Sequence, residues 1–241
     1  PWPTGVSVFP KPGVTRPTFL VFPASSIPSG QMQIEIRYRG PDPKETQSYV
    51  AALMLQELAN TPSSRFQTAV RKGMPKGTDI QDLRIVYTPT RNSSWLAVES
   101  TIAVPSGKNP ADLAFSFKEL VRGTELYMVR ANASYFASAE YQGAREALLE
   151  KKMAEEGDPL QSAARMARLW SWGIAPFLLQ ESDAIMKTGQ KNISQLVDTY
   201  VQKNLEVVMV RIDPKLYETY KKSFSNYSFE TVSSQNALWW R

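Results

Sequence analysis

The clearest hydrophobic pattern in the chain is the alternation over residues 31–39, where every second residue is apolar. The apolar positions of this stretch are Met32, Ile34, Ile36 and Tyr38. A period of two predicts a strand with one face in the core and one polar face. Two further strands are expected over residues 83–88 and 94–104, and the turn-prone residues 90–93 between them favour an antiparallel pair.

Helical patterns occupy most of the remaining chain. An Ala-rich apolar segment over residues 44–60 follows the Gly-Pro-Asp-Pro break at residues 40–43. A second helix is expected to begin at the capping sequence of residues 61–64 and to end at Gly73. Further helices are expected over residues 110–121, 138–156, 159–172, 177–187, 193–201 and 214–223, and further strands over residues 205–212 and 228–232.

The helix expected over residues 159–172 has well-defined boundaries. Asp158 is a typical N-cap residue, Pro159 suits the first helical position, and Gly173 follows the end. The spacing i, i+3, i+4 and i+7 is typical of an amphipathic helix. The apolar residues at this spacing are Leu160, Ala163, Ala164 and Ala167.

The order of these elements predicts an α+β fold, in which an antiparallel sheet is covered on one face by segregated helices. Residues 1–30 contain seven prolines, a composition that favours an extended N-terminal arm. We therefore expect a single domain over residues 31–241, preceded by this arm over residues 1–30.

Composition restricts the chemistry, because the 241 residues include no histidine and no cysteine. Their absence excludes a histidine general base, Ser-His-Asp and Cys-His nucleophile systems, and the usual ligands of zinc, haem and iron–sulfur clusters. A carboxylate pair, a Ser-Lys dyad, a Tyr or Lys base, or carboxylate-held Mg²⁺ or Ca²⁺ stays possible. We predict no catalytic residue, no metal ligand and no cofactor in this chain.

The net charge of +5 and the sequence pI of about 9.3 raise the question of an anionic partner. The basic residues are scattered and form no stripe that would follow a phosphate backbone, so nucleic-acid binding is not expected. The longest apolar stretch, residues 49–55, is far shorter than the roughly 20 residues of a membrane-spanning helix. No membrane span is predicted.

Three segments resemble the M16 zinc metallopeptidases, the family of insulinase and the mitochondrial processing peptidase. The sequence Ser-Ser-Arg-Phe-Gln-Thr-Ala-Val-Arg of residues 63–71 is similar to the family's Ser-Ser-Arg-Leu stretch and the segment that follows it. Residues 138–152 resemble a family helix with a basic-rich run. Residues 192–214 resemble the late helix, the Val-rich closing strand and the Pro turn. The resemblance covers roughly residues 30–215 and implies the LuxS/MPP-like metallohydrolase fold.

The resemblance also implies a role. The family's active half holds zinc with a His-x-x-Glu-His motif and a downstream Glu, and a chain without histidine cannot supply these ligands. It therefore resembles the non-catalytic half, whose partner is a zinc-bearing catalytic half in the same longer chain or in a separate subunit. Together the halves would enclose a peptide substrate and form a zinc metalloendopeptidase. The alternative is a structural subunit of a larger assembly that has no role in proteolysis.

In several family members this half supplies an Arg and, seven positions later, a Tyr that contact the substrate. Arg71 matches the Arg position and is the candidate substrate-binding residue, whereas Thr78 stands in place of the Tyr. The alternative for Arg71 is a cation at a helix C-terminus, where it would interact favourably with the helix dipole.

Three other groups have two interpretations each. Trp170, Trp172 and Phe177 either pack in the core or line a peptide cleft. The carboxylates of residues 155, 156 and 158 either form a solvated helix end with its cap or hold a hard cation. Trp239 and Trp240 either dock on a partner or lie beneath the sheet.

Overall fold

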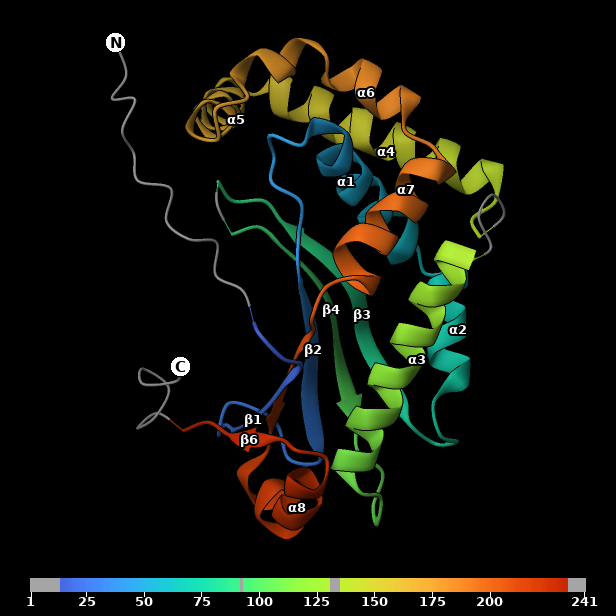
Figure 1. The fold of residues 1–241 in the computed structure, drawn as a ribbon, viewed down its shortest axis with the longest axis vertical. Helices are drawn as coiled ribbons and strands as arrows, with labels where there is room; N and C mark the ends of the chain where they lie inside the picture. The colour runs from blue at the N-terminus through green and yellow to red at the C-terminus, as the bar shows by residue number, and fades with distance from the viewer. Residues whose placement is uncertain (1–13, 92, 131–134, 234–241) are drawn as a thin grey trace.

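A computed structural model describes residues 14–91, 93–130 and 135–233, and shows one layer of helices against a six-stranded sheet (Figure 1). The strand order is β3-β4-β2-β5-β1-β6. The strands are β1 (Thr18–Pro23), β2 (Gln31–Arg39), β3 (Asp79–Thr88), β4 (Trp95–Ala103), β5 (Val207–Ile212) and β6 (Glu230–Thr231). The α-helices are α1 (Thr46–Asn60), α2 (Arg65–Gly73), α3 (Pro110–Arg130), α4 (Ser138–Gly157), α5 (Pro159–Ser171), α6 (Glu181–Lys187), α7 (Gln190–Val197) and α8 (Pro214–Asn226).

The sheet is mixed, which corrects the prediction of a wholly antiparallel sheet. Strands β3, β4, β2 and β5 pair antiparallel in that order, but β1 pairs parallel with both β5 and β6. A parallel pair needs a long crossover connection, and residues 24–206 lie between β1 and β5. Local sequence patterns do not reveal such a distant partner.

Strand β1 lies inside the segment predicted as an N-terminal arm. It is an inner strand of the sheet, with Val21 fully buried, and it is bounded by Pro17 and Pro23. Proline is tolerated at the ends of a strand, where a missing N–H costs no ladder hydrogen bond. Part of the Pro-rich segment therefore belongs to the core of the fold.

The core lies between the sheet and the helices. The alternating side chains of β2 are buried, with exposed fractions of 0 to 4% for Met32, Ile34, Ile36 and Tyr38. Helix α1 packs against β3, and α3 and α7 extend the layer (Figure 1). Within the capping sequence predicted over residues 61–64, Ser64 is the N-cap of α2, since its hydroxyl accepts a hydrogen bond from Gln67 N at 3.2 Å.

Several helix boundaries differ from the prediction. Helix α3 continues to Arg130, nine residues beyond the predicted end at 121. The predicted helix over residues 177–187 is a 3₁₀ turn η1 (Ala175–Leu179) followed by α6. Helix α7 ends in a π turn η2 (Asp198–Gln202). Within the described residues, the helices are too short or too polar to cross a lipid bilayer.

Helix α5 faces the opposite way from its hydrophobic pattern. Leu160 is 79% exposed, and Ala163, Ala164 and Ala167 are exposed as well, while Arg165 and Leu169 are buried. Asp158 caps this helix as predicted, accepting from Leu160 N at 2.8 Å and from Gln161 N at 3.3 Å. The apolar stripe read from the sequence therefore lies on the solvent side.

Two of the three groups with two interpretations have a place in the described structure. Trp172 and Phe177 pack edge-on against Tyr49, with ring centroids 6.3 and 6.1 Å away, whereas Trp170 is 54% exposed. Glu155 and Glu156 form ion pairs with Arg165 at 3.3 Å, so they complete a charge cluster at the end of α4. Trp239 and Trp240 lie outside the described residues.

Candidate functional site

The face of the sheet that bears the polar residues of β2 to β5 is hollowed. A cavity of about 390 Å³ is lined mainly by side chains of these four strands. A second cavity of about 760 Å³ adjoins it at the end of β2 and shares Arg37. The alternation in β2 places Gln33, Glu35 and Arg37 on this face, opposite to the core. We refer to the two cavities together as the sheet hollow.

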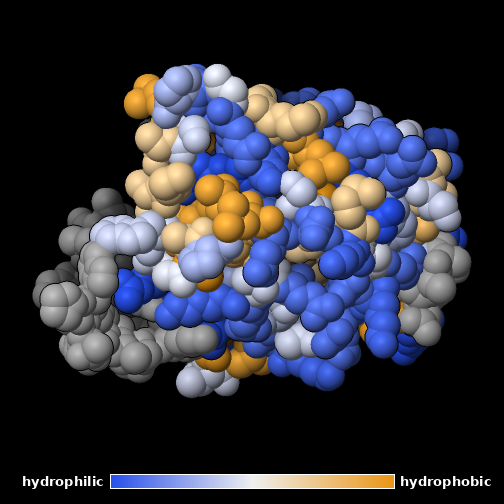
Figure 2. Space-filling model, turned by 90° about the horizontal axis from the view of Figure 1, so that it is seen from above, coloured by the Kyte–Doolittle hydropathy of each residue, from blue (hydrophilic) through white to orange (hydrophobic). Residues whose placement is uncertain are grey.

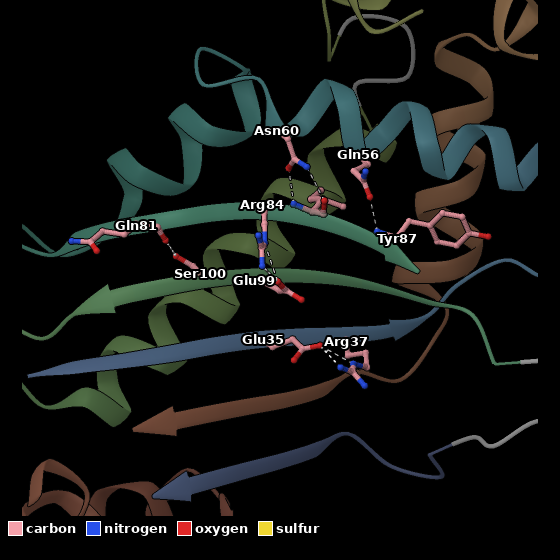
Figure 3. Close-up of polar contacts among 10 residues, drawn as sticks. Glu35, Arg37, Gln56, Asn60, Gln81, Arg84, Tyr87, Glu99 and Ser100 are labelled. Atoms are coloured by element: carbon pink, nitrogen blue, oxygen red, sulfur yellow. Dashed lines mark hydrogen bonds and ion pairs between the residues drawn. The ribbon is translucent and has the colours of Figure 1, made fainter. Parts of the chain in front are cut away.

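Two ion pairs lie in the sheet hollow, one along β2 and one between β3 and β4 (Figure 3). Glu35 Oε1 lies 2.5 Å from Arg37 Nη2, and Glu99 Oε2 lies 2.9 Å from Arg84 Nη2. Glu35 and Glu99 are directly opposite in the β2–β4 register, a like-charge arrangement that destabilises a sheet when it is left uncompensated. Each carboxylate has its own arginine, so the two pairs compensate that repulsion.

Aromatic and irregular backbone features shape the floor of the hollow. The Arg37 guanidinium lies 3.7 Å from the centroid of the Trp95 ring, a cation–π contact that fixes the side chain against the sheet. A β-bulge in β3 sets Asp82 and Leu83 opposite the single residue Ser100, and Asp82 has a positive φ of 50°. Ser100 Oγ donates to the Gln81 carbonyl at 2.9 Å beside the bulge.

The sheet hollow carries an excess of positive charge. Its lining contains five cations, Arg37, Arg39, Arg84, Arg211 and Lys203, and three carboxylates, Glu35, Asp82 and Glu99. Arg39 and Arg211 are exposed and form no ion pair with any other described residue. A surface of this kind favours ligands that combine hydrogen-bonding groups with negative charge.

The edge of the sheet at β3 is closed by side chains of the neighbouring helices (Figure 3). Asn60 donates to the Ile85 carbonyl at 2.9 Å and accepts from the Ile85 N–H at 2.7 Å. Gln56 accepts from the Tyr87 N–H at 2.9 Å, and Gln67 donates to the Leu83 carbonyl at 2.7 Å. These contacts occupy the outward groups of three alternate residues, so a peptide cannot add a strand here without displacing them.

Arg71 lies at this closed edge and lines neither cavity. Its guanidinium donates to the Ile80 carbonyl and, at 3.3 Å, to Gln67 Oε1. These contacts brace the end of α2 against the start of β3. Thr78 lies in the connecting loop, and its buried hydroxyl has no hydrogen-bond partner among the described residues. The structure thus gives Arg71 a bracing contact, and its contact with substrate stays a prediction.

No group of three or more Asp or Glu side chains in the described part of the chain is arranged to hold a metal ion. The alternation over residues 31–39 predicted the polar face of β2 that lines the sheet hollow, but the ion pairs of the hollow were not predicted. Alternation shows which side chains share a face, whereas the ion pairs depend on the order and register of the strands.

No protein-family model and no curated protein sequence matches the chain. Similarity appears among solved structures. A protease from Helicobacter pylori aligns with a TM-score of 0.63 and 11% identity, over 80% of this chain and 43% of that one. An M16 peptidase inactive domain from Pseudomonas fluorescens aligns with a TM-score of 0.58 and 13% identity, over 84% of this chain and 46% of that one.

A third similar structure is close to the length of a single domain. The inactive peptidase domain of a Bordetella parapertussis protein named as a zinc protease aligns with a TM-score of 0.57 and 14% identity, over 77% of this chain and 92% of that one. The chain has the fold of the M16 peptidases. This finding confirms the resemblance drawn from the sequence, and it agrees with the non-catalytic half because the chain contains no histidine. The chain spans less than half of the Helicobacter and Pseudomonas structures.

Proposed function

We propose that this chain is a non-catalytic M16-type half that pairs with a zinc-bearing half and helps to enclose and orient peptide substrates. The observation that carries the proposal is an M16 fold without any histidine, combined with a polar hollow across the sheet. The zinc and its ligands would belong to the partner half. The contribution of this chain would be to hold the peptide near the metal.

The sheet hollow has the properties that such a role requires. An extended peptide carries a polar backbone, and the hollow offers hydrogen-bonding side chains on four strands. Enclosing the peptide between two halves would exclude water and raise its effective concentration at the metal. Because the ion pairs are fixed within the sheet, their charged side chains can interact with the peptide without rearranging much.

Arg71 is the residue for which the family resemblance predicts direct substrate contact. To act in this way its guanidinium would share its hydrogen bonds between the Ile80 carbonyl and the peptide, since five N–H donors are available. The Tyr that accompanies this Arg in the family is replaced by Thr78. Of the family's Arg–Tyr pair, only the Arg71 position is therefore kept in this chain.

The first test is isolation of the protein from its native source under mild conditions, with mass spectrometry of the full chain and of any stoichiometric companion. The proposal expects a His-x-x-Glu-His half, either in the same longer chain or bound beside it. Finding neither would remove the catalyst from the proposal and favour the structural subunit.

The second test measures peptide cleavage by the assembled protein. Arg71→Ala is expected to slow cleavage while assembly stays intact, and Arg71→Lys is expected to restore only part of the rate because it cannot form the same fork of hydrogen bonds. Lys72→Ala removes a neighbouring exposed cation and serves as the matched control. Thermal unfolding of each variant separates a loss of contact from a loss of the α2–β3 brace.

One observation favours the alternative of a structural subunit without a role in proteolysis. Both hydrogen bonds of Arg71 go to groups of its own chain, as expected for a residue that only supports the fold. If Arg71→Ala lowers stability but leaves the cleavage rate per assembled complex unchanged, the structural role is the better description.

A further inference from the structure

Exposed apolar side chains occur at the end of the molecule formed by α4, α5 and α6 (Figure 1). They include Met153 on α4, Leu160 on α5 and Met186 on α6. Figure 2 views this end and shows the apolar groups interrupted by hydrophilic ones. Such a mixed surface does not indicate the chemistry of a partner. The sheet hollow is different, because its charged and apolar side chains follow a fixed order along the strands.

The unpaired cations of the sheet hollow lie far apart. Arg211 on β5 is opposite Gln33 in the β2–β5 register, and Arg39 follows Gln33 by six residues on the same face of β2. At about 3.3 Å per residue, the two arginines are about 20 Å apart along the strand direction. Both are exposed and have no ion-pair partner among the described residues. Lys203, also in the lining, is paired with Asp198.

The charges between these two ends are already compensated. Arg37 Nη2 lies 2.5 Å from Glu35 Oε1, and Arg84 Nη2 lies 2.9 Å from Glu99 Oε2. The remaining carboxylate of the lining, Asp82, belongs to β3, three strands away from β5 in the sheet. A ligand that lies along β2 and β5 would therefore meet unpaired positive charge from the described lining only at its two ends.

Apolar side chains separate the two positive ends. Met209 and Val207 on β5 are in register with the polar face of β2, so they lie on the face of the hollow. Both are partly exposed, and each lines one of the two cavities. From Arg211 to Arg39 the surface thus changes from positive to apolar and back to positive.

The spacing of this order matches that of an extended peptide. In an extended chain every second side chain faces the same way, at intervals of about 6.6 Å. Arg211, Met209 and Val207 follow the same interval along β5, and Arg39 lies one step further on β2. A peptide with the pattern acidic-x-apolar-x-apolar-x-acidic would therefore set each inward side chain against a complementary one.

We propose that the sheet hollow binds extended peptide segments in which two acidic residues, six positions apart, flank alternating apolar residues. This inference rests on the proposed function and names its class of substrate. The two carboxylates would pair with Arg39 and Arg211, and the apolar side chains would cover Met209 and Val207. A nucleic acid fits this order less well, because its phosphates recur about every 3.4 Å along a strand, whereas the unpaired arginines are about 20 Å apart.

The test is fluorescence anisotropy of a labelled ten-residue peptide titrated with the full chain at low salt. The peptide has glutamates at its second and eighth positions, valines at the fourth and sixth, and neutral polar residues elsewhere. It is expected to bind, and to bind more weakly as salt is added, because salt screens exposed ion pairs. Replacing both glutamates by glutamine is expected to weaken binding about ten-fold. Moving one glutamate from the eighth to the seventh position turns it away from the sheet and should cost about three-fold.

Variants of the chain locate the binding site. Arg39→Gln and Arg211→Gln are each expected to weaken binding about three-fold, and the double variant about ten-fold, because distant sites act independently. Arg211→Glu should prefer a peptide in which one glutamate is replaced by lysine, since the charges are then reversed on both sides. Lys72→Gln removes an exposed cation outside the hollow and should bind like the wild type. Thermal unfolding checks that each variant is folded.

Three results would overturn the inference: a glutamine peptide that binds as tightly as the acidic one, arginine variants that bind it unchanged, or a single-stranded oligonucleotide that binds more tightly. None of these would remove the proposed function if the isolation described above finds a catalytic half, because the substrate would then be of another class. Conversely, an isolation that finds no catalytic half would overturn the proteolytic role, and the anisotropy measurement would still decide whether the hollow binds acidic peptides.

Discussion

The phenolic oxygen of Tyr38 lies 3.0 Å from Glu125 Oε2, and this buried hydrogen bond joins β2 to α3. Glu125 is 3% exposed and forms no ion pair within the described residues. Burial raises the pKa of Glu125 to about 8, against a lowering by the Tyr38 hydrogen bond and a further raising by the nearby Glu206. The side chain is therefore mostly a neutral acid at pH 7.

Glu125 makes stability depend on pH. Its pKa is raised in the folded state, so between about 4.5 and about 8 the folded chain keeps a proton that the unfolded chain releases. Stability should therefore fall as pH rises through this window. Glu125→Gln has no proton to lose at this position. As pH rises, its free energy of unfolding should therefore increase relative to that of the wild type by up to about 1.4 kcal/mol per pH unit. Urea denaturation at several pH values between 5 and 8 measures the difference. Glu150→Gln, at an exposed position, should follow the wild-type profile.

The Asn60 side chain is expected to matter more than an ordinary polar residue. Asn60→Ala would leave both the N–H and the carbonyl of Ile85 without a partner and should cost about 1–3 kcal/mol. The Ile85 amide should also exchange its hydrogen faster. Asn60→Asp keeps an acceptor for the N–H and should cost less. Equal losses for the two variants would show that the paired hydrogen bonds are not what Asn60 contributes.

The Arg165 cluster should respond asymmetrically to substitution. Arg165→Met leaves Glu181, which is 5% exposed, without its cation and should destabilise the chain by about 3–5 kcal/mol. The double variant Arg165→Met with Glu181→Met removes both charges and should recover much of that loss. Chemical denaturation gives the stabilities, and hydrogen exchange in α5 shows whether this helix loosens first. A double variant as unstable as the single one would contradict the prediction.

Metal removal should leave this chain unchanged. It has no histidine or cysteine, and its described residues include no acidic group arranged as a metal site. The melting temperature is therefore expected to be the same with and without a chelator, and any bound zinc should be well below one equivalent. A chelator-dependent shift of the melting temperature of the purified chain would contradict this.

Local signals predicted the elements whose neighbours are close in sequence. The alternation of β2, the Ser64 cap of α2 and the Asp158 cap of α5 each depend on a few adjacent residues, and each agrees with the structure. The polar face of β2 that lines the sheet hollow also follows from alternation. Its ion pairs do not, because Arg84 and Glu99 meet only once β3 and β4 pair in register around the bulge.

Distant partners explain what the sequence did not predict. Strand β1 is short and lies among prolines, and its partner β5 is nearly two hundred residues away. The orientation of α5 depends on Glu181, a residue of another helix that neutralises Arg165. An arginine in isolation indicates a solvent face. Here three carboxylates from two other helices make its burial favourable, so the apolar face is the one left outside.

The closed edge of β3 has a consequence for how the protein behaves at high concentration. A bare edge strand is a template on which further chains can grow into fibrils, and many sheets avoid this with charges or prolines. Here amide side chains of α1 and α2 already form hydrogen bonds with the outward backbone groups of β3. At the other edge β6 is only two residues long, too short to recruit a new strand effectively. Both edges therefore resist amyloid-type growth, and association is left to surfaces made of side chains.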